Sequence, residues 1–165
     1  MSWWFRFSGL AFSAALLSGS FFAQDHTAEL RARFSAETDA VHKAKLLTKL
    51  SDSEFREIQD LIGAGKLNEA SPIADQLADE ADSAAKALDA RAKDAEKHPE
   101  GYKQLEMSVR GSLRRMNNIL IELSGDDQKP FLAVRDRLEV LEKQLIRELF
   151  PHRPDEPPAQ SAPKS

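Results

Sequence analysis

The chain has 165 residues, with 23 Lys and Arg against 27 Asp and Glu, a net charge of −4 and no cysteine. Without cysteine, disulfides, thiol nucleophiles, thiolate metal sites and a lipid-modified cysteine anchor are all excluded. The acidic balance argues against a protein that binds nucleic acid or an anionic membrane, because both activities usually need a positive surface.

The first 23 residues have the layout of a secretory signal peptide, with one charge at Arg6, an apolar run over Leu10–Leu17 and small residues near Ala23. The run is shorter than the roughly 20 apolar residues of a spanning helix. We expect cleavage after Ala23, or after Ser20; the alternative is an uncleaved segment that anchors the chain in the inner membrane. Loss of Arg6 leaves 22 basic and 27 acidic residues, a net charge of −5. The mature chain is therefore expected to be periplasmic or secreted.

Residues 24–38 are expected to form a loose segment or a short helix, and residues 39–150 a four-helix domain. The first helix covers about 39–62, with Thr38 or Asp39 as its N-cap. A capping-box pattern over Ser51–Glu54 leaves open a break near Ser53, but the apolar stripe continues in phase across it, so we predict one helix. The stripe consists of Ala40, Ala44, Leu47, Ser51, Ile58 and Ile62, widened by Phe55 and Leu61.

Three more helices are predicted, over about 68–97, 101–124 and 127–149. Pro72 marks the start of the first of them, because proline suits the first turn, and Gly125 is a left-handed stop after the second. The predicted buried stripes are Ala70, Ile73, Ala74, Leu77, Ala81, Ala84, Leu88, Ala92 and Ala95; then Leu105, Val109, Leu113, Met116, Leu120 and Leu123; and then Phe131, Val134, Leu138, Leu141, Leu145 and Leu149.

Short connections between the helices predict an all-α fold, an antiparallel up-down-up-down four-helix bundle. Residues 151–165 contain five prolines and few apolar side chains, so we expect a disordered Pro-rich tail.

The turn Leu61–Ala70, LIGAGKLNEA, contains Gly-Ala-Gly-Lys but does not meet the requirements of a phosphate-binding loop. Asp60 stands where such a loop has its first glycine, Leu67 follows the lysine instead of Ser or Thr, and a charged helix precedes it. We expect Gly63 or Gly65 to end the first helix. Gly65, Leu67 and Ala70 resemble the turn of a tetratricopeptide repeat, which implies helix–turn–helix geometry over about ten residues. More broadly, the chain resembles exported bacterial helical-bundle proteins of unassigned activity.

The titratable residues predict no catalytic, cofactor or metal site. No two histidines lie three or four positions apart, as metal ligands on one helix usually do, and Ser112 lacks the strand and the glycine pattern of a hydrolase nucleophile. Carboxylate pairs such as Glu139 and Glu142 are common on exposed helices. An acidic face with Asp75, Asp79 and Asp82 remains as an alternative site for a divalent ion. The histidines are His26, His42, His98 and His152.

One face of the third predicted helix carries cations beside its apolar stripe. Its residues are Lys103, Arg110, Arg114 and Asn117, with Ile121 continuing the face. Such a face either pairs with acids of neighbouring helices or binds a carboxylate or phosphate of a partner. Arg115 points the other way and is expected to serve the bundle.

These patterns favour an exported, non-catalytic protein-interaction or scaffold module of the cell envelope. A periplasmic holdase-type chaperone is the alternative, for which Leu132, Val140 and Ile121 are candidate client-binding residues off the stripes. A divalent-metal-binding helical protein is a second alternative. The oligomeric state stays open.

Overall fold

The computed structural model describes residues 19–91 and 95–151. Within these ranges the chain forms helices and no strand, so the all-α prediction is confirmed. Most of the expected leader, and the expected tail after Pro151 together with His152, lie outside the described residues. The helices are α1 Gly19–Ala36, α2 Ala40–Gly63, α3 Leu67–Asp89, α4 Glu100–Glu122, the short 3-10 helix η1 Gly125–Gln128, and α5 Lys129–Leu149.

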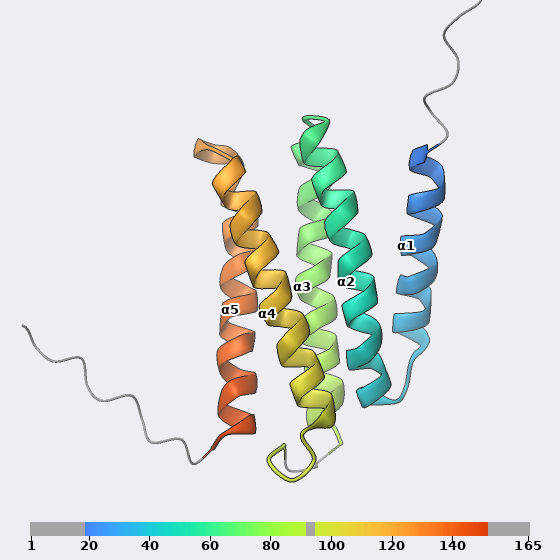
Figure 1. The fold of residues 1–165 in the computed structure, drawn as a ribbon, viewed down its shortest axis with the longest axis vertical. Coiled ribbons are helices and arrows are strands. Elements are labelled where there is room, and N and C mark those ends of the chain that lie inside the picture. The colour runs from blue at the N-terminus through green and yellow to red at the C-terminus, as the bar shows by residue number, and fades with distance from the viewer. Residues whose placement is uncertain (1–18, 92–94, 152–165) are drawn as a thin grey trace, which may run out of the picture.

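The helices lie side by side and successive α-helices alternate in direction (Figure 1). Helix α2 packs on both α3 and α4, and α5 packs on the same two helices from the other side. Helix α1 was expected as a loose or short segment over residues 24–38; it is longer, begins at Gly19 and packs mainly on α2. It therefore lies outside the group formed by α2 to α5, at the edge of the molecule in Figure 1.

The ends of α2 follow from local chemistry. The Asp39 side chain caps the helix by accepting a hydrogen bond of 2.7 Å from the backbone N–H of His42. The helix runs without a break past Ser53. Beyond its last residue, Gly65 has a φ of 72°, a left-handed conformation that glycine adopts without strain.

Helix α3 begins where it was predicted, within one residue, but ends earlier. It begins at Leu67, so Pro72 lies inside the helix instead of opening it. Packing of Leu67 against the core explains why the helix begins before Pro72, because tertiary contacts outweigh local preference. The helix ends at Asp89 instead of near Lys97, and the predicted stripe residue Ala92 lies outside the described residues.

The start of α4 requires a glycine. A Cβ atom at Gly101 would overlap Leu88 of α3 and lie 3.2 Å from Val41 of α2. This close approach brings the first turn of α4 against α2 and α3. At the other end, Gly125 has a φ of 59°, and the Gln128 side-chain amide donates to the carbonyls of Leu120 and Leu123, each at 2.8 Å.

The core lies between α2, α3, α4 and α5. All six predicted stripe residues of α5 are buried, and Leu123 is the one predicted stripe residue of α4 that is only partly buried. On α2, Ile62 and Leu61 are likewise half-buried near the turn. Leu30 and Phe34 of α1 extend the same core outward.

Candidate functional site: a buried ion cluster between three helices

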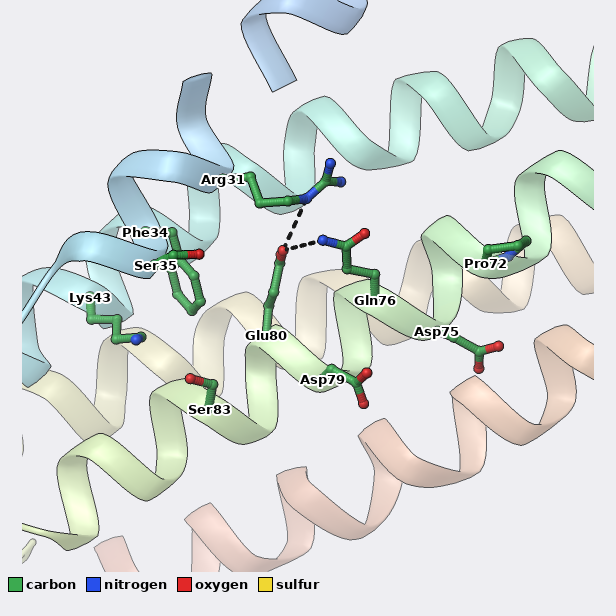
Figure 2. A pocket seen from close by; sticks show the side chains of 10 residues that line it. All are labelled: Arg31, Phe34, Ser35, Lys43, Pro72, Asp75, Gln76, Asp79, Glu80 and Ser83. Carbon is green, nitrogen blue, oxygen red and sulfur yellow. Dashed lines mark hydrogen bonds and ion pairs between the residues drawn. The ribbon is translucent and has the colours of Figure 1, made fainter. Parts of the chain in front are cut away.

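Arg31 of α1 joins two carboxyl groups that come from two different helices. Its Nη2 lies 2.6 Å from Oε1 of Glu54 on α2, and its Nε lies 3.3 Å from Oε1 of Glu80 on α3. The Nε2 of Gln76 also donates to Oε1 of Glu80, at 3.3 Å. Figure 2 shows Glu80 reaching toward both donors. We call Arg31, Glu54, Glu80 and Gln76 the ion cluster, and Glu54 and Glu80 the acid pair.

The acid pair is buried, whereas its counter-ion reaches the surface. The Glu54 side chain is 0% exposed and that of Glu80 9%, against 29% for Arg31. The Oε2 atoms of Glu54 and Glu80 are buried without a hydrogen-bond partner. Buried carboxylates are stable only when charge and hydrogen bonds compensate their lost hydration. One guanidinium cannot fully compensate two of them.

Burial shifts the protonation of the acid pair. Loss of hydration, reinforced by the nearby charge of Glu80, raises the pKa of Glu54 to about 8, although Arg31 opposes the shift. Burial also raises the pKa of Glu80. Because the two groups interact, the pair titrates as a unit and keeps one proton at neutral pH. With one proton on the pair, the formal charges of Glu54, Glu80 and Arg31 sum to zero.

An open groove of about 740 Å³ lies over Glu80, and residues of α1, α2 and α3 line it (Figure 2). At one end the ammonium of Lys43 lies 4.7 Å from the centre of the Phe34 ring. Asp75 lines the α3 side of the groove. Glu54 is fully buried and does not line the groove, so the cluster is suited to holding a proton and fixing α1 in place.

The acidic face predicted as an alternative metal site is engaged by a cation. Arg137 of α5 binds Asp79 at 2.6 Å and Asp82 at 2.8 Å. Among the described residues, no three His, Asp or Glu side chains come together as a metal site would require. His42 instead lies 2.7 Å from the Glu37 carboxylate.

The structure places the four residues of the predicted basic face on the exposed side of α4. Arg110 is engaged: it pairs with Glu106 and lies 3.5 Å from Glu142 of α5. No ion pair with a described residue engages Lys103 or Arg114. The basic face is thus split between one paired cation and two that face solvent.

Arg115 lies on another flank of α4 and contacts α2. Its Nη2 is 2.5 Å from Asp52, and its guanidinium lies 5.4 Å from the centre of the Phe55 ring. It therefore joins two helices of the fold, through an ion pair and a cation–π contact.

Large apolar side chains accompany the cations on the exposed side of α4. Met107 is 64% exposed and Ile121 82%. On α5, Val140 is 68% exposed, whereas Leu132, the third candidate client-binding residue, packs partly against the core. Ile121 and Val140 thus meet the exposure requirement of the chaperone hypothesis, and Leu132 does not.

Comparison with known proteins adds no relative: no family model, curated protein or solved structure matches the chain. None of the described helices combines the length and apolar character needed to cross a membrane. The function is therefore inferred from the residues themselves.

The ion cluster was not predicted from the sequence, although a signal for it exists. Glu54 lies three residues after Ser51 and four before Ile58, so it occupies a core position of its stripe. Glu80 stands in the same phase on α3. An acid at a core position predicts a buried cationic or hydrogen-bonding partner, but the stripe does not identify which residue is that partner.

Proposed function

We propose that the chain is an exported, non-catalytic interaction protein of the cell envelope, in which an up-down-up-down four-helix bundle presents the exposed side of α4 to a partner protein. The signal-peptide pattern of residues 1–23 supports export to the periplasm or beyond. The packing of α2 to α5 around one core supports the bundle.

The observation that carries the proposal is a second regular stripe on α4. It runs opposite the core and has spacings of 4, 3, 4, 3 and 4, the repeat with which one helix packs along another. Two exposed apolar side chains and two solvent-facing cations within it suit an amphipathic partner helix that carries acidic groups. Its members are Lys103, Met107, Arg110, Arg114, Asn117 and Ile121. We call this set the α4 seam.

Capture of partners from an envelope extract tests the α4 seam. The variant Lys103→Glu, Arg114→Glu reverses its two solvent-facing charges, and Lys45→Glu, Lys49→Glu makes the same charge change on exposed positions of α2. We expect the wild type and the α2 variant to retain a common partner that the seam variant loses. Equal retention by all three proteins would refute the proposal.

Cross-linking locates the contact directly. A photoreactive residue at Asn117, within the seam, is expected to cross-link to the partner, whereas one at Lys45 is not. Cross-links at Lys45 alone would place the partner on another face.

A holdase-type chaperone is the second candidate, because Ile121 and Val140 expose apolar surface. The wild type should then suppress aggregation of an unfolded client at stoichiometric amounts, and Ile121→Ser, Val140→Ser should suppress it less. No suppression by the wild type would exclude this function.

Two features of the chain's ends belong to the same proposal: a leader that is removed, and an unfolded Pro-rich tail over residues 151–165. Mass spectrometry of the protein recovered from the envelope identifies the mature N-terminus. A start at residue 21 or 24 supports cleavage, whereas a start at Met1 supports the anchored form. Narrow amide dispersion for the tail in an NMR spectrum supports an unfolded segment.

A further inference from the structure

Helix α1 is fixed to its neighbours by apolar packing, a contact between two hydroxyl groups and ion pairs. Leu30 and Phe34 are buried in the core, and Oγ1 of Thr27 lies 2.8 Å from Oγ of Ser53 on α2. Arg31 supplies the ion pairs to α2 and α3. The helix lies at the edge of the molecule (Figure 1) and packs mainly on α2, whereas α2 to α5 also pack on one another.

The charge that α1 meets depends on one proton. Arg31 of α1 and Glu80 of α3 are the charged groups that contact Glu54, and Gln76 adds an uncharged donor to Glu80. Lys43 of α2, with Asp75 and Asp79 of α3, lines the groove outside the cluster. With one proton on the acid pair the cluster is neutral, and without it a net negative charge is buried beneath α1.

We propose that the acid pair is a shared-proton site that couples loss of its proton to the release of α1 from α2 and α3. The geometry supports the coupling, because two buried carboxyls face one guanidinium and each has an oxygen without a donor. Release of α1 admits water to both groups and removes the cost of ionising them together.

The sign follows from which state binds the proton. The docked state keeps its proton up to about pH 8, where Glu54 ionises, whereas carboxyls open to water lose theirs at lower pH. Between these limits the docked state carries one more proton than the released state. The ratio of docked to released α1 therefore falls as the pH rises, by up to about tenfold per pH unit, and becomes constant above about pH 8.

Release would change the surface available to other molecules. The apolar side chains of Leu30 and Phe34, and the part of α2 beneath them, would become exposed together. This surface is separate from the α4 seam, so the inference stands whether or not the seam binds a partner.

Amide hydrogen exchange measures this equilibrium in the full chain. Protection factors of residues 27–36, corrected for the intrinsic dependence of exchange on pH, report the opening of α1, and those of α5 serve as an internal reference. We expect the α1 protection of the wild type to fall by up to about 100-fold between about pH 6 and 8 relative to α5.

Glu54→Gln keeps the shape of the side chain and removes its proton equilibrium, so its α1 protection should not change over this range. Glu80→Gln leaves a single carboxyl opposite Arg31, so its α1 protection should change less with pH than that of the wild type; it replaces the first variant if that protein does not fold. Glu57→Gln, on the same helix but outside the cluster, should follow the wild type.

Two results would overturn the proposal. The first is an α1 protection that does not respond to pH in the wild type, or that responds equally in the wild type and in Glu54→Gln. The second is a carbon NMR titration in which the carboxyls of Glu54 and Glu80 both lose their protons below about pH 5, since no shared proton would then exist near neutral pH.

Discussion

Replacement of Glu54 by glutamine should make the stability of the protein less dependent on pH. Burial raises the pKa of Glu54 from 4.5 to about 8 in the folded chain. Below about pH 4.5 the carboxyl is protonated in both the folded and the unfolded state, so its ionisation does not lower the free energy of unfolding. Between about pH 4.5 and 8 the unfolded chain has released the proton and the folded chain has kept it, so the free energy of unfolding falls as the pH rises.

The magnitude follows from the two pKa values. At about 1.4 kcal/mol per pKa unit, the interval from 4.5 to about 8 corresponds to a loss of about 5 kcal/mol, complete above pH 8. Release of α1 relieves part of this cost, so about 5 kcal/mol is a ceiling. Glu54→Gln lacks the proton equilibrium and should gain stability over the wild type by up to about 4 kcal/mol between about pH 5 and 8.

Urea unfolding followed by circular dichroism at several pH values measures this difference. Replacing Glu54 also changes the titration of its coupled neighbour Glu80, and the remaining titrating groups are common to both proteins, so the difference between them reports on the acid pair. Glu57→Gln serves as the control and should stay parallel to the wild type. A difference between Glu54→Gln and the wild type that stays constant within about 0.5 kcal/mol from pH 5 to 8 would refute the reasoning about the acid pair.

Three further predictions concern the fold. Phe131→Ala, at a side chain with no exposed surface, should lower the free energy of unfolding by about 3–5 kcal/mol in urea titrations. Phe150→Ala, at a residue 56% exposed, should change it by less than about 0.5 kcal/mol. Similar losses in the two variants would mean that α5 is not packed as described. Gly65→Ala should lower stability by about 1–2 kcal/mol because the φ of Gly65 is 72°. Gly63→Ala, at the last residue of α2 and with open space at its Cβ, should raise stability by about 0.5–1 kcal/mol. Thermal unfolding measures both, and a change of the same sign in the two variants would show that the turn is assigned wrongly. Asp39→Ala should cost about 1 kcal/mol of stability through loss of the α2 cap, an effect absent if the cap hydrogen bond does not form in solution.

The sequence predicts the helices wherever a long apolar stripe dominates. The six stripe residues of α5 recur every three or four positions, and all are buried, since a single face of this helix is apolar. The end of α3 was missed because alanines continue at helical spacing after Asp89. Alanine favours helix but carries little apolar surface, so its spacing alone does not fix where packing ends.

The candidate site was harder to predict because it depends on contacts between helices. Arg31 lies 23 residues from Glu54 and 49 from Glu80 along the chain. A helical stripe shows which side of each helix faces inward. Which residues of two helices contact each other depends on the relative axial position of the helices, and a stripe does not fix that position. The basic face of α4 could be proposed from helical phase alone, without Met107, whereas the pairing of Arg110 with Glu142 depends on the relative position of α4 and α5.

If the leader is cut as proposed, the span of α1 also bears on the order of cleavage and folding. The helix includes Ser20 and Ala23, the two positions after which the leader is expected to be cut. A protease must draw its substrate into an extended strand, and the hydrogen-bonded turns of a formed helix resist this. Maturation would therefore have to precede folding of this end of the protein. Every side chain that secures α1, from Thr27 onward, would remain on the processed chain.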